Sequence, residues 1–214
     1  MKRKITCLCD KVFEAEVPEE IDLDANPAYL DEIKNGSFFN FICPGCGKKH
    51  KPEFPLSILW PSKKLRFEVL PEPERGEFYK REKKGSDAAE TIIGYPEMAD
   101  RLAVIHDGFE PAPVEALKYY LLLKAEEQYP DEELEIWYFG FSKGGDASGG
   151  DSQGTESFLE FHIHGIKENE VAVMKVPLSL YEKTLHDYKS NPNKEIFSIL
   201  RVQTYLSIKN TMRR

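Results

Sequence analysis

Four cysteines in two close pairs are the residues of this chain best suited to chemistry. Cys7 and Cys9 are one residue apart, Cys43 and Cys46 are two apart, and the sequence contains no other cysteine. Two such pairs can supply four thiolates at about 2.3 Å from one tetrahedral metal ion. The proline and glycine within the second pair favour the tight turn that lets both sulfurs face the same ion. The spacing therefore predicts one structural zinc site, or an iron site where iron takes the place of zinc during expression.

A redox role for the Cys43–Cys46 pair is an alternative interpretation. Thiol–disulfide oxidoreductases place such a pair at the start of a helix, whose dipole lowers the pKa of the first thiol. Here Pro52 and Pro55 follow closely and prevent a helix of useful length. In a reducing compartment, paired cysteines favour metal binding or catalysis over structural disulfides. His50 is a fallback ligand should one cysteine be displaced.

Two strands and one short helix are expected to position the cysteines. Residues 4–17 have the pattern of a strand that carries the first pair, and residues 37–42 form a second strand that runs into the second pair. A helix from Pro27 to Lys34 lies between them, with proline at its first position and Asn35-Gly36 at its end. Pairing of the two strands as a hairpin would bring the four thiols together.

The rest of the chain predicts helices and strands in succession. Residues 51–70 are extended, and the charged stretch 71–94, poor in aliphatic residues, is interpreted as a connection. A helix pair follows, in which Glu115 and Lys118 are expected to face water. The predicted elements are helices over 95–106, 113–128, 179–189 and 196–209, strands over 134–141, 158–165 and 171–176, and a loop over 142–157.

The fold class that these patterns indicate is α+β. Residues 1–72 form a four-cysteine, zinc-ribbon-like β module with one short helix. Residues 73–214 form an α+β C-terminal region that contains the helix pair, a small antiparallel sheet and C-terminal helices. The helix at 179–189 is expected to begin with a capping box, because Ser179 and Glu182 have the required spacing.

Charge limits the range of partners. The formal net charge of -8 argues against broad binding to nucleic acid or to an anionic membrane. Residues 1–66, however, hold 11 Lys and Arg against 10 Asp and Glu. Cations near the cysteines compensate the charge of about -2 of a zinc ion bound by four thiolates, or they form a nucleic-acid-binding rim with Phe38, Phe39 and Trp60 as stacking partners. The nearly neutral balance favours charge compensation.

Glu160, His162 and His164 alternate along one predicted strand and form a second group with metal-ligand chemistry. The residues between them are apolar, so an ordinary polar outer face of a sheet explains the pattern. The sequence contains no nucleophile elbow, phosphate-binding glycine loop or helical pair of carboxylates. An enzyme that uses the C-terminal sheet is kept as an alternative, for which a pocket around the two histidines and a carboxylate is required.

The hydrophobic pattern contains neither a signal peptide nor a membrane-spanning segment, which bears on localisation. No apolar run of signal-peptide length follows Met1-Lys2-Arg3-Lys4, and no stretch approaches the roughly 18 apolar residues that span a bilayer. We therefore expect a cytoplasmic protein without membrane contact.

The cysteine region resembles the bacterial and archaeal CpXC domain family. The resemblance covers about the first 125 residues and lies in the motifs Asn26-Pro27-x-x-Leu30, Asn35-Gly36-Ser37, Phe39-x-Phe41-x-Cys43-Pro44-x-Cys46-Gly47 and Ile105-His106-Asp107-Gly108-Phe109. It implies a zinc-binding module of uncharacterised function with Cys7, Cys9, Cys43 and Cys46 as the ligands. The first pair departs from the full Cys-Pro-x-Cys pattern, since one residue lies between its cysteines.

These observations together predict an interaction or regulatory module rather than an enzyme. A metal with four protein ligands has no open position for a substrate. The expected partner is a protein, and nucleic-acid binding through the basic rim is the alternative.

Overall fold

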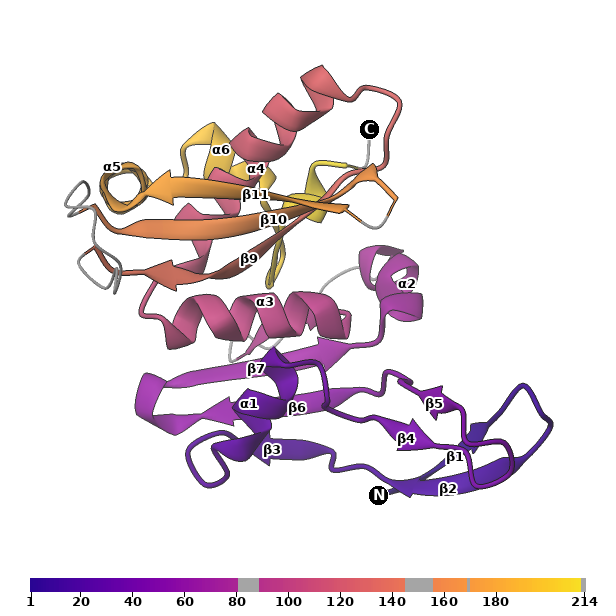
Figure 1. Cartoon of the computed structure of the whole chain (residues 1–214). Coiled ribbons are helices and arrows are strands. Elements are labelled where there is room, and N and C mark those ends of the chain that lie inside the picture. The colour runs from indigo at the N-terminus through magenta and orange to yellow at the C-terminus, as the bar shows by residue number, and fades with distance from the viewer. Residues whose placement is uncertain (81–88, 145–155, 169, 213–214) are drawn as a thin grey trace. The chain divides into compact units, whose positions relative to one another are not determined.

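The computed structural model describes residues 1–80, 89–144, 156–168 and 170–212. It contains both helices and sheets, which confirms the α+β class (Figure 1). Contacts divide the chain into unit 1, Met1–Ala99 with Gln203–Tyr205, and unit 2, Asp100–Val202 with Leu206–Arg214. The domain division between residues 72 and 73 stays a prediction, because contacts alone do not show which segment folds by itself. Most of the predicted loop at 142–157 lies outside the described residues.

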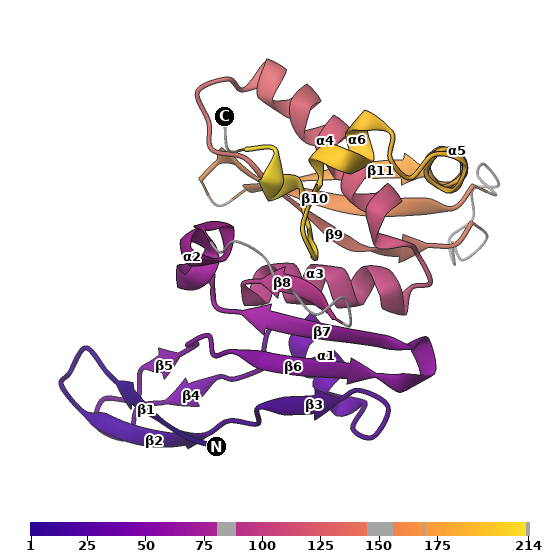
Figure 2. The same ribbon diagram turned by 180° about the vertical axis from the view of Figure 1, so that it is seen from behind.

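A mixed sheet forms the centre of unit 1. Its strands there are ordered β13-β8-β7-β6-β3. Strands β6 and β7 form an antiparallel hairpin through the 3-10 turn η1 (Pro61–Lys63), whereas β3 pairs with β6, β8 with β7 and β13 with β8 in parallel (Figure 2). Leu56, Ile58 and Trp60 alternate along β6 and are buried, as expected for a strand with one face on a core. The strand bounds are Glu20–Asp22 for β3, Leu56–Trp60 for β6, Leu65–Leu70 for β7, Glu90–Ile93 for β8 and Tyr205–Leu206 for β13.

In the described part of unit 1, helices α1, α2 and the start of α3 accompany the sheet. Helix α1 (Ala28–Lys34) confirms the predicted short helix after Asn26-Pro27. Part of the predicted connection at 71–94 is instead regular structure: the 3-10 turn η2 (Glu72–Glu74), helix α2 (Arg75–Lys80) and strand β8. The short apolar run of β8 is buried, but the charged residues around it gave the segment the composition of a connection. Helix α3 (Tyr95–His106) was predicted within the same bounds and continues into unit 2.

Unit 2 combines a three-stranded antiparallel sheet with helices. Strands β9 (Glu135–Ser142), β10 (Phe158–Lys167) and β11 (Glu170–Pro177) are ordered β11-β10-β9 and confirm the three predicted strands (Figure 1). Leu159, Phe161 and Ile163 are buried on the inner face of β10. Helices α4 (Pro111–Gln128) and α5 (Leu178–Ser190) confirm two predicted helices, and α4 contacts β9 and α5.

The C-terminal segment differs from its prediction. A helix over 196–209 is wrong: α6 spans Glu195–Ile199, and the chain then forms β12 (Arg201–Val202), β13 and the 3-10 turn η3 (Ile208–Asn210). Gln203 has a φ of 59°, a left-handed turn conformation that ends any helix. The capping box at Ser179 is also wrong, since α5 begins directly after Pro177 and has no side-chain cap.

None of the helices in the described ranges has the length and apolar composition needed to span a bilayer.

Candidate metal centre

Each cysteine pair lies in the turn of its own hairpin. The single strand predicted over 4–17 is wrong: strands β1 (Lys2–Thr6) and β2 (Val12–Glu16) pair antiparallel, and the chain reverses between them. The backbone N–H of Cys7 donates to the Lys11 carbonyl at 2.9 Å, and that of Asp10 donates to the Cys7 carbonyl at 2.9 Å. Asp10 has a φ of 64°, which aspartate tolerates better than most residues. This turn holds Cys7 and Cys9.

The second hairpin was not predicted, and the expected hairpin between the strands at 4–17 and 37–42 does not form. The predicted strand at 37–42 forms only at β4 (Phe41–Ile42), which pairs with β5 (Lys49–His50). Phe39 has a φ of 52°, so the chain cannot be extended at this residue. Around the second pair, the Cys43 N–H donates to the Lys48 carbonyl at 2.8 Å, and the Gly47 N–H donates to the Cys43 carbonyl at 3.0 Å. Gly47 has a φ of 72° and closes the turn.

The two turns bring the four sulfurs together. All four Sγ atoms lie within 4.8 Å of one another. Two sulfur–sulfur distances join one hairpin to the other, 3.5 Å between Cys7 and Cys46 and 3.7 Å between Cys9 and Cys43. A regular tetrahedron with metal–sulfur bonds of about 2.3 Å has sulfur–sulfur edges of about 3.8 Å. The spacing therefore fits a tetrahedral ion coordinated by two sulfurs from each turn.

A glycine allows the two turns to approach each other closely. A Cβ added at Gly45 would lie 3.3 Å from the Lys11 side chain and 3.6 Å from the Cys9 Sγ. Below the turns, Ile5, Ala15 and Val17 form a small buried cluster with four partly buried phenylalanines packed against it. The turns thus lie above a core that is apolar but small.

The sulfurs occupy two different environments. Cys7 and Cys43 are buried, whereas Cys9 and Cys46 are exposed. Burial raises the pKa of the Cys43 thiol, but the backbone N–H groups of Cys46 and Gly45 outweigh it and lower the pKa to about 6; the Gly45 N–H lies 3.3 Å from the sulfur. At Cys7, the backbone N–H of Cys9 lowers the pKa, but burial and the neighbouring thiols raise it to about 12. Binding of a metal requires deprotonated thiols and therefore releases protons here.

His50 lies beside the sulfurs. Its Nε2 is 3.1 Å from the Sγ of Cys7, and its ring meets Phe13 edge to face at a centroid distance of 6.0 Å. When Nε2 carries the proton, the imidazole donates a hydrogen bond to the sulfur, a contact that orients a ligand and tunes its charge. The residue predicted as a fallback ligand is therefore placed as a hydrogen-bond partner of the cluster.

The other predicted groups are not placed for the chemistry considered. His162 stacks on Phe139 at 3.9 Å, and its Nε2 is 3.2 Å from Glu160 Oε1, while His164 is exposed. Within the part of the chain that the structure describes, the four cysteines are the one metal-capable group of at least three Cys, His, Asp or Glu side chains. Phe38 and Trp60, two of the three aromatic residues considered for stacking on nucleic acid, are buried.

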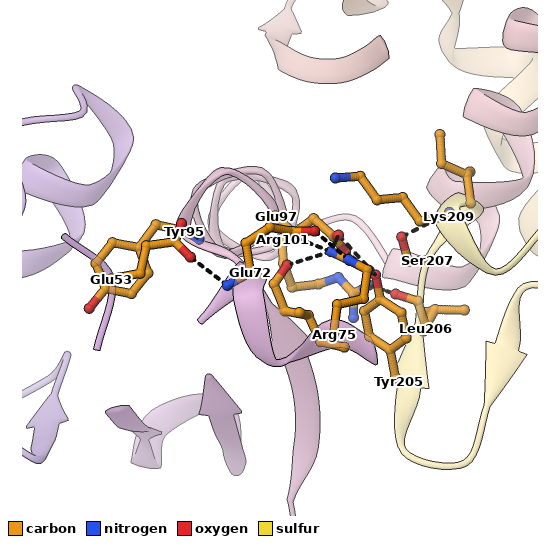
Figure 3. A network of polar contacts seen from close by, with 12 residues as sticks. Glu53, Glu72, Arg75, Tyr95, Glu97, Arg101, Tyr205, Leu206, Ser207 and Lys209 are labelled. Atoms are coloured by element: carbon orange, nitrogen blue, oxygen red, sulfur yellow. Dashed lines mark hydrogen bonds and ion pairs between the residues drawn. The ribbon is translucent and has the colours of Figure 1, made fainter. Parts of the chain in front are cut away.

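A polar network around Arg75 in unit 1 was not predicted (Figure 3). The guanidinium donates to Glu72 and Glu97 at 2.5 Å, to the Tyr205 hydroxyl at 2.5 Å and to the Ile93 carbonyl at 3.0 Å. Burial lowers the pKa of Arg75, but the two carboxylates and the tyrosine raise it above its ordinary value. The donors are used by protein acceptors, so the network joins α2, β8, α3 and β13 and serves the fold.

A buried ionic cluster in unit 2 corrects a second expectation. Glu115 and Lys118 were expected in water, but both are buried, and the Lys118 ammonium contacts Glu115 at 2.7 Å and also the Asp100 carboxylate. Burial opposes the charge of Lys118, but its two carboxylate partners raise its pKa above the ordinary value. Asp100 also accepts from the Tyr138 N–H at 2.6 Å, and Glu115 from the Ile208 N–H at 2.8 Å.

This geometry defines a protein with four clustered thiols, two from each of two hairpin turns, which is compatible with metal binding. The CpXC protein family model matches residues 5–118, more than half of the chain, and the chain belongs to this family. An uncharacterized protein of Treponema pallidum (strain Nichols) is 28% identical over 223 residues, which cover 97% of this chain and 97% of that protein. No solved structure matches the chain.

Proposed function

We propose that the chain is a zinc-binding protein in which the ion has a structural role and joins the two hairpin turns. The observation that carries this proposal is the set of four Sγ atoms within 4.8 Å of one another, drawn from turns that are distant in sequence. A tetrahedral set of four thiolates suits zinc, with iron as the competing ion. Four protein ligands leave no position for a substrate, so the proposed role is to organise a surface rather than to catalyse a reaction.

Exposed apolar side chains at the tips of the hairpins favour a protein as the partner. Leu8 is 86% exposed and lies between the first two cysteines, and Ile42, 70% exposed, precedes the second pair. Val12, at the start of β2, is 50% exposed. Lys11 and Lys48 are exposed in the same turns, and Lys49 is exposed at the start of β5. We infer an interaction or regulatory module of the cytoplasm, whose partner offers an apolar groove flanked by acidic side chains.

Metal analysis of protein purified without added zinc tests the first part. We expect about one zinc per chain, lost in the Cys43→Ser/Cys46→Ser variant. A matched control is Leu8→Ser/Ile42→Ser, which changes the tips and leaves the ligands, so that zinc content stays at the parent value. A metal-free protein whose hairpins remain folded would contradict a structural ion, and stoichiometric iron in protein expressed with zinc available would contradict the identity of the metal.

The same two variants test the partner. Affinity capture from the source organism's own extract should recover an acidic protein with the parent chain and with neither variant. Recovery that is unaffected by Leu8→Ser/Ile42→Ser would contradict a role for the tips. Tight RNA or DNA binding at low salt that weakens steeply as salt rises would instead favour the basic rim as the functional surface.

A further inference from the structure

A cavity of about 340 Å³ lies in unit 1, in a part of the fold that the four cysteines do not use. Its volume is at the lower end of the range of about 300–1,000 Å³ that is usual for small-molecule sites. Helix α1, the Gly36 turn, the segment at 51–53 and the start of α3 contribute its lining. All of these segments belong to unit 1.

The floor of the cavity is apolar and fixed in place. Ile33, Phe38 and Met98 line it, and each is at most 2% exposed. The Phe38 ring stacks on Phe39 at 3.9 Å between centroids and meets Tyr95, another lining residue, at 5.8 Å. A floor of this kind favours an apolar group, because its packed side chains are held in place before any ligand arrives.

The rim of the cavity is positively charged. Lys34 and Lys51 line it and are both exposed. The Lys51 ammonium lies 3.4 Å from the point where a Gly36 Cβ would stand, so it is positioned over the turn that ends α1. Within the described residues, Lys51 makes no hydrogen bond or ion pair with the protein. An ammonium at the mouth of an apolar cavity favours an anionic ligand.

One carboxylate, Glu53, also lines the cavity, and its oxygens are already hydrogen-bonded. They accept from the backbone N–H of Tyr95 at 2.8 Å and from that of Glu72 at 2.6 Å (Figure 3). The two amide dipoles stabilise this charge where it stands. With two lysines against one carboxylate, the lining keeps a net positive charge.

We propose that this cavity binds a small organic anion with an apolar body and one carboxylate. The body packs on Phe38 and Met98, and the carboxylate meets the ammonium group of Lys51. The site is independent of the metal centre, so it goes beyond the proposed structural zinc. Calorimetry on the zinc-loaded full chain tests it, with 3-phenylpropanoate as the probe and the neutral 3-phenylpropanamide as its charge control.

The expected dissociation constant of the acid is in the range of about 0.01–1 mM, as for other ligands of this size. The amide should bind at least about fivefold more weakly, since it lacks the charge. Lys51→Met should remove this difference, whereas Lys124→Met, the same change at an exposed lysine of α4, should leave it as in the parent. Equal affinity for acid and amide in the parent, or an acid affinity that Lys51→Met leaves unchanged, would overturn the proposal.

A second variant separates the cavity from its rim. Ala99 lines the cavity, and Ala99→Leu should fill it and abolish binding of both probes, while circular dichroism shows the parent's fold. Retained binding in this folded variant would place the probe elsewhere and overturn the proposal. The proposal also fails if about 5 mM acid gives neither heat nor chemical-shift changes at the lining residues of the parent chain.

Discussion

The cysteine hairpins and the core of unit 2 are stabilised by different means. In unit 2, twenty-two buried side chains form one described cluster. Under the cysteine turns, the corresponding cluster has three. Burying one aliphatic side chain contributes about 1.5–3 kcal/mol, whereas fixing one residue's backbone costs about 1–2 kcal/mol. Three such side chains, one of them alanine, and four partly buried phenylalanines form a small core for two hairpins, and we expect the proposed ion to supply further stabilisation.

Both regions gather groups that can bind a cation around a central position, but in the proposed metal centre the cation has a different source. In unit 2, the chain provides it: the Lys118 ammonium lies between Asp100 and Glu115. Among the cysteines, the proposed zinc ion would come from solution, because the lysines of the turns are exposed and the sulfurs face one another. The comparison teaches that unit 2 carries its own cation in its sequence, whereas the proposed metal centre would depend on the zinc available in solution.

Removal of the metal should produce the largest change in stability, and this change should affect the cysteine hairpins but not unit 2. Stripping with a chelator under reducing conditions should lower amide protection at residues 1–17 and 41–50 at least about 100-fold, because structural zinc contributes about 10–16 kcal/mol in zinc-finger peptides. Strands β9, β10 and β11 should keep their protection. Hydrogen exchange with mass spectrometry measures both regions in one sample. Unchanged protection in the hairpins, or equal loss throughout, would contradict the comparison.

Removal of the internal cation should affect unit 2 next most strongly. Lys118→Met leaves two buried carboxylates without their partner and should lower the free energy of unfolding by about 3–5 kcal/mol. Urea denaturation measures the change, and Lys124→Met on the exposed face of the same helix should stay within about 0.5 kcal/mol of the parent. Zinc content should remain at the parent value. A loss of zinc in Lys118→Met would show that the two regions are not stabilised independently.

Loss of the contact between His50 and Cys7 should have an intermediate effect, which we expect on zinc affinity alone. His50→Ala removes the hydrogen bond to the sulfur and should weaken zinc binding about 10- to 100-fold. Competition with a fluorescent zinc chelator at fixed pH measures this ratio. His50→Gln, which keeps a donor, should recover part of the affinity. Equal affinities of the parent and both variants would limit His50 to packing against Phe13.

The smallest effect concerns an exposed ion pair of unit 2. A hydrogen bond from Lys194 at 2.9 Å lowers the pKa of Asp187 below its ordinary 3.8. Because the folded-state pKa is the lower one, the stabilisation is present above pH 3.8 and is lost as the pH falls through the folded-state pKa. The melting temperature of Asp187→Asn should therefore be slightly lower than that of the parent at neutral pH, and the two melting temperatures should be equal at about pH 2. A difference in melting temperature that grows as the pH falls would contradict this prediction.

Periodicity and residue preference predicted much of the fold. The α+β class, α1, α3, α4 and the three strands of unit 2 followed from helical spacing, strand alternation and the Asn35-Gly36 stop. The approach of the four cysteines followed from their spacing in two close pairs, although the expected pairing of the strands at 4–17 and 37–42 does not form. These features depend on local sequence, in which residue types and their spacing carry the whole signal.

The missed features depend on distant contacts or on unusual backbone conformations. Asp10 and Phe39 adopt positive φ without being glycine, so the reversals they make have only weak local signals. Glu115 and Lys118 look like a solvent-facing pair until Asp100 and the backbone of Ile208 are placed beside them. The partial helical period at 196–209 was overridden by the turn at Gln203 and by the pairing of β13 with β8.

The pairing of β13 with β8 has a consequence for synthesis on the ribosome. Thr91 pairs through its N–H with the Thr204 carbonyl at 3.0 Å, and the two hydroxyls lie 2.8 Å apart. Translation produces β8 long before residue 204, so the growing chain carries an open strand edge, and Arg75 lacks the Tyr205 hydroxyl, until synthesis is nearly complete. A fragment cut at residue 118, where the family match ends, would keep every cysteine and still leave that edge available to other chains.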